Sequence, residues 1–260
     1  MNKIVVITGG TSGIGLELKK NYENDGDTVI TISTRELDDK NHYSASVSDE
    51  KRMGEVIDDI ASRYGRIDVL IANAGFGMSG VTELLPTEEI KKLTEVNYYG
   101  TLYLVRSALK YMERGSRIIL VSSAMALFPV PFRSIYGSVK SAVLTLSFAL
   151  RMELAPLGID VVAFCPGDIK TNFTANRVKD YKTSERYGTR LETATEKSDS
   201  REDKRIPADK CASKMYKLSK KKKTRPFYII GGKYRALYFI TRITPKSWLL
   251  NITSKLYGGK

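Results

Sequence analysis

Short apolar runs alternate with segments of helical spacing along most of this 260-residue chain. The apolar runs are bounded by turn residues and predict buried strands over 4–7, 28–32, 69–72, 118–121, 159–164 and 227–230. The intervening segments predict helices over 14–24, 50–64, 87–112, 136–154 and 207–218. Strands that alternate with helices form parallel sheets through right-handed crossovers. We therefore predict an α/β fold: a doubly wound parallel sheet in a single domain.

Composition narrows the class of protein. Apolar residues make up 42% of the chain and charged residues 27%, which is a globular balance. Because no stretch is apolar over the length of a bilayer and the N-terminus passes directly into a strand, we expect a cytoplasmic protein, at most one at the membrane surface. Two cysteines, Cys165 and Cys211, and one histidine, His42, are too few for a disulfide scaffold or a metal site of thiolates or histidines. We predict no metal.

The net charge of +13 comes from the end of the chain. Residues 1–200 carry 25 Lys and Arg against 26 Asp and Glu, whereas residues 201–260 carry 17 against 3. A near-neutral body with a basic end is not the pattern of a nucleic-acid-binding domain, so we expect no nucleic-acid partner. Aromatic and aliphatic residues alternate with Lys and Arg across 234–257. This pattern suits a helix on an anionic membrane surface, a docking surface for an acidic carrier protein, or a helix that closes a substrate pocket.

A glycine-rich turn follows the first strand. Gly9, Gly13 and Gly15 permit a tight turn, a close approach of the backbone to a pyrophosphate, and close packing of the next helix. The N-terminus of that helix offers unpaired N–H groups and the positive end of its dipole to phosphates. We predict a dinucleotide site whose contacts here are Gly9, Thr11, Ser12, Gly13, Ile14 and Gly15.

The end of the second strand bears on the choice between NAD and NADP. An acidic residue at this place binds the 2′-hydroxyl of the NAD ribose. Here Ser33 and Thr34 are neutral and Arg35 follows them, which suits a 2′-phosphate and favours NADP(H). Glu36 is close enough in sequence to turn toward a ribose, so NAD(H) stays open.

Two Tyr-x-x-x-Lys pairs are present, Tyr136 with Lys140 and Tyr216 with Lys220. Only the first follows a serine, Ser123, by thirteen residues; an aspartate stands at that offset before the second. On one helix face a lysine ammonium favours the phenolate of its tyrosine, which lowers the tyrosine pKa. We therefore expect Tyr136 to be a proton donor to a carbonyl oxygen, and Ser123 to hydrogen-bond the same oxygen.

These motifs, in this order, resemble the short-chain dehydrogenase/reductase family in its one-domain Rossmann-fold form. The resemblance spans about residues 1–232, leaving 233–260 as a C-terminal helical extension. It implies that Tyr136 is the acid/base, that Lys140 also binds the nicotinamide ribose, and that Ser123 orients the substrate. It further implies that Asn97 holds a water in a proton relay to Lys140, although an asparagine on a long helix is often a packing or kink residue.

The same resemblance implies further cofactor contacts and an assembly. Asn73 would help shape the sheet around the cofactor, and Thr171 would contact the nicotinamide amide. Ser46 departs from the family, since an aspartate commonly meets the adenine there. Family members often form homo-oligomers. Besides Tyr136 and Lys140, the implied contacts outside the glycine turn are Ser33, Arg35, Val47, Asn73, Ala74, Gly75, Pro166, Gly167, Ile169 and Thr171.

Together these observations predict an NADP(H)-dependent enzyme that interconverts a ketone and a secondary alcohol. The polar segment 171–206 predicts a mobile lid that carries Phe173, Tyr181, Tyr187 and Leu191. With the apolar extension, it suggests a bulky hydrophobic substrate such as a hydroxysteroid or another lipid-like ketone. Two alternatives stay open: reduction of a 3-oxoacyl thioester on an acidic carrier, and a non-catalytic NADP-binding sensor or docking module.

Overall fold

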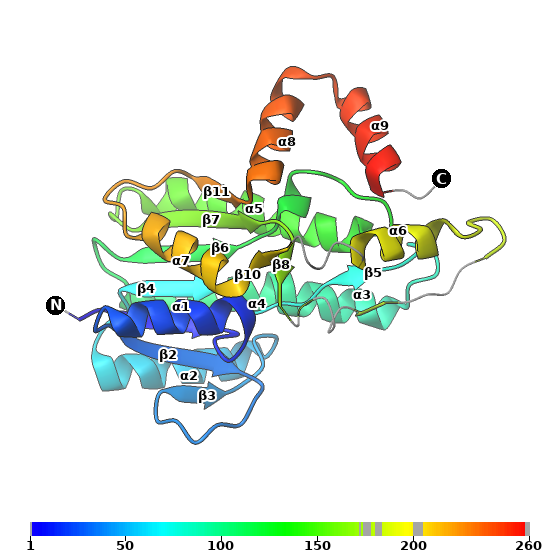
Figure 1. Ribbon diagram of the computed structural model, residues 1–260. Helices are drawn as coiled ribbons and strands as arrows, with labels where there is room; N and C mark the ends of the chain where they lie inside the picture. Colours follow the sequence, from blue (N-terminus) through cyan, green and yellow to red (C-terminus); the bar gives the residue numbers. More distant parts are fainter. Residues whose placement is uncertain (1, 172, 174–177, 180–183, 200–204, 258–260) are drawn as a thin grey trace.

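The computed structural model describes residues 2–171, 173, 178–179, 184–199 and 205–257. Its centre is a sheet of seven parallel strands in the order β11-β7-β6-β4-β1-β2-β3 (Figure 1). The strands are β1 (Ile4–Thr8), β2 (Thr28–Ser33), β3 (His42–Ser44), β4 (Val69–Ala72), β6 (Arg117–Val121), β7 (Asp160–Pro166) and β11 (Phe227–Ile230). The predicted doubly wound parallel sheet is confirmed.

Helices cover both faces of the sheet (Figure 1). Helices α1 (Gly13–Asn24) and α7 (Ala208–Ser219) pack on one face, and α2 (Glu50–Tyr64), α4 (Gly100–Ala108) and α5 (Ser134–Leu154) pack on the other. The sequence sets the ends of α2: the Asp49 side chain accepts from the Arg52 amide at 2.9 Å, and Gly65 ends the helix in a left-handed conformation. Each face thus has its own apolar core.

The long predicted helix over 87–112 is interrupted. It consists of α3 (Thr87–Thr94), a five-residue π turn (Glu95–Tyr99), α4 and a short 3-10 turn (Leu109–Tyr111). Asn97 lies inside the π turn and is fully buried, and its Nδ2 donates to the carbonyls of Leu93 at 3.0 Å and Phe76 at 3.2 Å. The π turn therefore directs Asn97 toward the loop that follows β4.

The predicted strands all occur, with ends that differ by at most two residues, but shorter elements were missed. Strand β3 has no fully buried side chain and so lacks an apolar run. Two small parallel pairs lie outside the main sheet: β5 (Met78–Ser79) with β9 (Val178–Lys179), and β8 (Ile169–Lys170) with β10 (Ile206–Pro207). Helix α6 (Arg190–Asp199) lies within the segment that we predicted to be a lid.

The C-terminal extension forms two helices, α8 (Gly232–Ile243) and α9 (Lys246–Tyr257), that project from the body (Figure 1). The first turn of α8 is packed on the body, because a Cβ added at Gly167 would lie 2.1 Å from the Tyr234 ring. The Tyr234 hydroxyl also donates to Asp168. Within the described ranges, no helix combines the length and the apolar content needed to span a bilayer.

Candidate functional site

A large cavity lies at the carboxyl ends of β1, β4, β6 and β7, where the strand order reverses on either side of β1. Its volume, including the open mouth, is about 1270 Å³. The walls come from the glycine turn, the loops after β4, β6 and β7, helix α5 and the segment after β8. They consist of Gly9, Ser12, Gly13, Ile14, residues 73–77, residues 121–123, Met125, Arg133, Tyr136, Lys140, residues 166–169, Thr171, Phe173 and Arg205.

The glycine turn brings backbone to the cavity without side-chain obstruction. Gly9 and Gly13 have φ of +66° and +52°, values that L side chains rarely adopt. A Cβ at Gly15 would lie 2.2 Å from the Gly9 carbonyl oxygen, so only glycine lets α1 start this close to the turn. Ser12 precedes α1, and its side chain makes no capping hydrogen bond. The first N–H groups of α1 are therefore left for a ligand.

Asn73 fixes the turn to the neighbouring strand. Its Nδ2 donates to the Thr8 and Gly9 carbonyls at 3.0 and 3.3 Å. The Thr8 hydroxyl accepts from the backbone amides of Asn73 and Ala74 at 3.0 and 3.1 Å. Asn73 thus holds the ends of β1 and β4 in register beside the cavity, consistent with the shaping role that the family resemblance implies.

Arg35 lies next to the glycine turn on the surface. Its Nη1 donates to the Thr11 carbonyl at 3.3 Å, and its amide donates to the Ser33 hydroxyl at 3.2 Å. The Thr11 and Ser33 hydroxyls are 3.2 Å apart. The single histidine supports this loop, because His42 Nε2 lies 2.7 Å from the Arg35 carbonyl. The structure therefore gathers a guanidinium and two hydroxyls at the end of β2.

Tyr136 and Lys140 lie one turn apart on α5, and both line the cavity while staying at least nine-tenths buried. Lys140 Nζ donates to the Val121 carbonyl at 3.1 Å. Burial lowers the Lys140 pKa to about 8, since the charged amine loses water. Burial raises the pKa of the nearby Cys165 thiol to about 12. Lys140 is therefore an amine that can change protonation near neutral pH.

Ser123 begins the turn that follows β6. Its hydroxyl accepts from the Met125 amide at 3.2 Å, which orients the side chain at the cavity wall. The preceding Ser122 hydroxyl donates to the Lys140 carbonyl at 2.7 Å. The Ser122 bond, together with the bond from Lys140 Nζ to the Val121 carbonyl, ties the end of β6 to the middle of α5. Ser123, just after the end of β6, and Tyr136 and Lys140, on α5, are therefore held beside one another as one unit.

Asn97 faces the same unit from behind. A Cβ at Gly75 would lie 2.4 Å from Asn97 Oδ1 and 3.5 Å from Lys140 Nζ, so both atoms approach Gly75. Among the residues that the structure describes, Asn97 Oδ1 and Ser79 Oγ are the buried side-chain polar atoms without a hydrogen-bond partner. Buried acceptors are normally satisfied, so Asn97 Oδ1 is suited to an ordered water. The packing of Asn97 in the π turn and the implied role in the site are therefore compatible.

The second Tyr-x-x-x-Lys pair lies away from the cavity. Lys220 Nζ is 2.8 Å from Asp25 Oδ2, and the Tyr216 hydroxyl donates to the same carboxylate. Partial burial, together with this donation to Asp25, raises the Tyr216 pKa. This pair is a surface link between α7 and the end of α1, which separates it from Tyr136 and Lys140.

Some predicted contacts lie outside the cavity lining, and some lining residues were missed. Thr11 and Gly15 belong to the glycine turn but do not line the cavity, and Ser33 and Arg35 lie beside the turn. Val47 is buried in the core against Gly100. Tyr181 lies outside the described residues. Phe173 packs on the Tyr136 ring with centroids 6.0 Å apart. The lining residues that were missed are Phe76, Gly77, Val121, Ser122, Met125, Arg133, Asp168 and Arg205.

Met125 and Arg133 are close in sequence to Ser123 and Tyr136, and Asp168 directly follows Gly167, so proximity to the motifs was the only signal for them.

Three features fit a dinucleotide: a glycine cradle that any Cβ would fill, an uncapped helix N-terminus, and a buried lysine beside an unpaired amide oxygen. In the part of the chain that the structure describes, no group of three His, Cys, Asp or Glu side chains is placed to hold a metal.

Comparison with known proteins agrees with this geometry. A family model described as short chain dehydrogenase matches residues 3–182. The chain is 31% identical over 255 residues, 94% of either chain, to a probable short-chain type dehydrogenase/reductase, VdlC, of Helicobacter pylori. It is 33% identical over 180 residues, 67% of either chain, to a 3-ketodihydrosphingosine reductase of Bacteroides thetaiotaomicron. ElxO, solved with NADP bound, superposes with a TM-score of 0.74 at 27% identity, covering 91% of this chain and all of ElxO.

The buried Lys140 predicts a specific pH dependence of stability in the cofactor-free protein. Because its folded pKa, about 8, is below the ordinary lysine value of 10.5, the unfolded chain binds more protons between these two values. The free energy of unfolding should therefore rise with pH across this window, relative to Lys140→Met, by at most about 3 kcal/mol. Urea unfolding of both proteins from pH 7 to pH 11 measures the difference, and parallel profiles would contradict the shifted pKa.

Proposed function

The chain belongs to the short-chain dehydrogenase/reductase family, whose members are oxidoreductases that act on CH–OH groups, and on this premise we propose that it is an NADP(H)-dependent enzyme for a bulky hydrophobic ketone and its secondary alcohol. The observation that carries the proposal is one cavity lined by the glycine turn and by Ser123, Tyr136 and Lys140 together. The presence of Ser123, Tyr136 and Lys140 in this cavity argues against the non-catalytic sensor, because a protein that only binds the cofactor needs no proton donor.

Each side chain of the unit has a distinct task in this proposal. A bound reduced nicotinamide supplies the hydride. Tyr136 donates its proton to the carbonyl oxygen of the ketone, and Ser123 donates a hydrogen bond to the same oxygen as it gains negative charge. The Lys140 ammonium favours the phenolate that Tyr136 becomes. The unpaired Asn97 Oδ1 holds a water that carries a proton to Lys140. The rigid packing of α5 keeps these groups in place.

The proposed preference for NADP(H) depends on Arg35. Its guanidinium lies beside the glycine turn with the Thr11 and Ser33 hydroxyls, so one cation and two donors are available to a 2′-phosphate. The relative ElxO binds NADP, which is compatible with the proposal. NAD(H) would lack the phosphate that this cluster is suited to bind.

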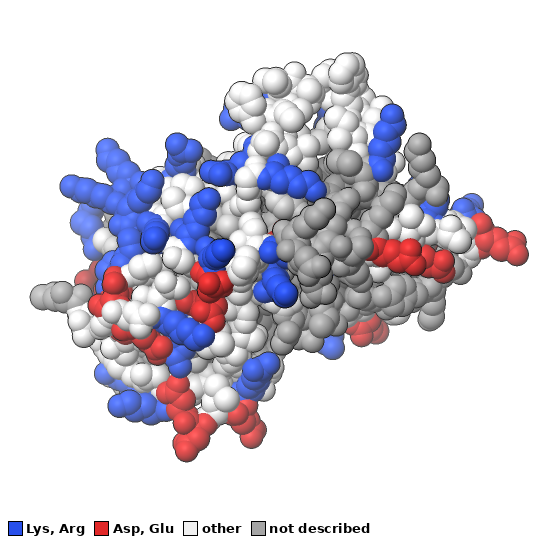
Figure 2. Space-filling model, viewed as in Figure 1, with Lys and Arg blue, Asp and Glu red and all other residues white. Residues whose placement is uncertain are grey.

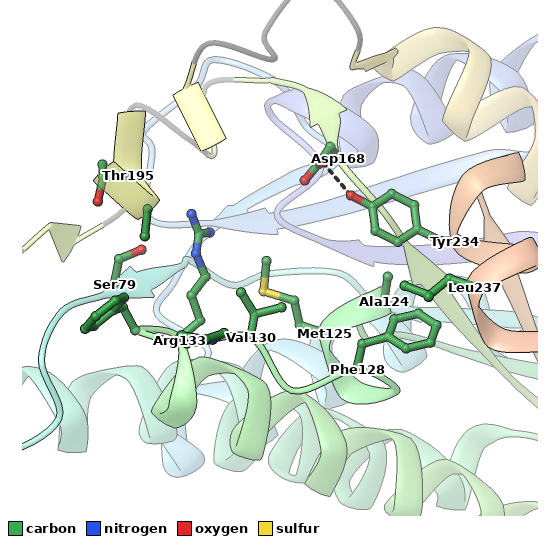
Figure 3. A pocket seen from close by; sticks show the side chains of 13 residues that line it. Ser79, Ala124, Met125, Phe128, Val130, Arg133, Asp168, Thr195, Tyr234 and Leu237 are labelled. Atoms are coloured by element: carbon green, nitrogen blue, oxygen red, sulfur yellow. Dashed lines mark hydrogen bonds between the residues drawn. The ribbon is translucent and has the colours of Figure 1, made fainter. Parts of the chain in front are cut away.

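A second hollow beside the cavity supports a hydrophobic substrate. Its volume, including the open solvent at its mouth, is about 650 Å³, and it shares Met125, Arg133 and Asp168 with the main cavity. Figure 3 shows Ala124, Phe128 and Leu237 gathered at one end of it, with the Arg133 guanidinium near its middle. We call it the apolar compartment; its walls are Ser79, Ala124, Met125, Phe128, residues 130–133, Asp168, Ala194, Thr195, Tyr234 and Leu237.

The apolar compartment would hold the chain or rings of the substrate while its carbonyl lies at Tyr136. By its name, the Bacteroides relative reduces 3-ketodihydrosphingosine, which is a ketone with a long chain. A 3-oxoacyl thioester on an acidic carrier is the second candidate, which the basic C-terminal part favours. Turnover of a carrier-bound thioester should weaken steeply as salt screens this docking, whereas turnover of a free lipid-like ketone should not.

Replacing Tyr136 with Phe tests the reaction. The variant should lose about 100-fold to 10,000-fold in kcat, because the proton donor is gone, while it still binds NADPH. Tyr216→Phe is the matched control and should keep full activity. NADPH oxidation over a panel of steroid, sphingoid, acyl-thioester and small ketones gives kcat, and NADPH fluorescence gives binding. Full activity of Tyr136→Phe on the best ketone would refute the assignment.

Replacing Arg35 with Ala tests the cofactor preference. A charged hydrogen bond contributes about 1.5–3 kcal/mol, so the ratio of kcat/KM for NADPH to that for NADH should fall about 10-fold to 100-fold. Lys40→Ala, which removes another exposed cation near β3, should leave the ratio unchanged. An unaltered ratio in the Arg35 variant would mean that Arg35 does not recognise the phosphate.

Filling the apolar compartment tests the substrate class. Val130→Trp adds an indole to its wall, and kcat/KM for long-chain or steroid ketones should fall about 10-fold or more. A small ketone on the same variant is the internal control, since it needs only the space at Tyr136. Equal losses for large and small ketones would show that the compartment does not hold the substrate.

A further inference from the structure

Helix α8 is apolar on two opposite faces. Its inner face packs on the body through Tyr234, Leu237 and Tyr238. Its outer face carries Phe239 and Ile243, which lie four residues apart and therefore on one side of the helix. These two side chains are 67% and 72% exposed, so the outer face is left without cover in the monomer.

Helix α9 continues the exposed apolar surface. Trp248 is 62% exposed, and Ile252 lies one turn further along the same side at 37%. Leu249 and Thr253 point the other way and are buried. We call residues 232–257 the hairpin. Its exposed large apolar side chains are Phe239, Ile240, Ile243, Trp248, Leu250 and Ile252.

Only positive charge accompanies this surface. The hairpin contains five Lys and Arg and no Asp or Glu. Arg235 and Arg242 are exposed on α8, and Lys246 and Lys255 are exposed on α9. Figure 2 shows the projecting tip white, with blue atoms on its flanks and no red on the visible face. An apolar stripe with flanking cations and no acid is complementary to the interface of an anionic bilayer.

We propose that the hairpin is a docking surface for an anionic membrane, with its exposed apolar side chains among the acyl chains and its cations at the headgroups. A second copy of the chain is a poorer occupant, because a self-complementary contact would bring the cations of both hairpins together without an acid to pair them. The proposal does not depend on the substrate, since it concerns only the outer face of the hairpin.

Docking would place the apolar compartment beside the lipid. Tyr234 and Leu237, on the inner face of α8, form part of its wall. The helix that lies on the bilayer is therefore the helix that covers the compartment. A lipid-like ketone would then reach the compartment at the membrane surface.

The chain contains its own reporter for this docking. Trp248 is the only tryptophan, and it lies on the exposed surface of the hairpin. Tryptophan emission of the full-length protein should shift to shorter wavelength with vesicles of phosphatidylcholine and roughly one-third phosphatidylserine. Binding to these vesicles, measured from the shift, should be about tenfold tighter or more than binding to phosphatidylcholine alone. High salt should weaken the shift, and brominated lipid should quench it.

Variants identify the surface. Phe239→Ser with Ile243→Ser should reduce vesicle binding about tenfold or more. Met152→Ser with Leu157→Ser, which removes exposed apolar side chains from the body, is the matched control and should leave binding unchanged. Circular dichroism checks that each variant is folded. Quenching of Trp248 by brominated lipid is measured on the unchanged protein, so this part of the test does not depend on the folding of a variant.

An emission spectrum that anionic vesicles do not change would overturn the proposal. So would a shift that appears on raising the protein concentration without lipid, together with a doubled mass in light scattering, because a second copy would then cover the hairpin.

Discussion

The burial of one lysine organises the centre of this molecule. Lys140 is held in the interior by a hydrogen bond to the Val121 carbonyl, and the cost of removing the charged amine from water lowers its pKa. Such a residue is stable there only if its surroundings are fixed. Ser122 provides this by bonding the Lys140 backbone carbonyl, which joins β6 to α5. The face of α5 that lines the cavity is consequently tied to the end of β6 by two hydrogen bonds.

The glycine turn has a comparable constraint on the other side of the cavity. Gly15 must approach the Gly9 carbonyl closely, and Asn73 bonds the carbonyls of the same turn from the neighbouring strand. The strand order reverses at β1, so the loops on its two sides run to opposite faces of the sheet and leave a cleft between them. The Asn73 bonds lie at this cleft. The site is thus a consequence of sheet topology, and a few hydrogen bonds set its shape.

The main strands and helices could be predicted because their apolar residues are periodic, and the motifs at strand ends located the cavity. Strand β3 is too short and too exposed for its sequence to show a periodic pattern of apolar residues. The π turn at Asn97 could not be predicted, since one extra residue per turn leaves no compositional mark. Arg133 was not predicted to lie near the site either, and for Tyr234 a helix that closes a substrate pocket was only one of three interpretations of residues 234–257. Tyr234 is distant in sequence from Gly167, and only the folded chain brings its ring there.

That last contact changes how the C-terminal extension should be regarded. From sequence alone the extension is separable from the family core, yet Tyr234 packs on Gly167 and bonds Asp168, which directly follow Pro166 in the loop that lines the cavity. A displacement of α8 must therefore alter the packing of that loop. Since the outer face of α8 is the exposed apolar surface, whatever covers it acts on the helix that supports the site. The extension is in this sense part of the wall of the apolar compartment.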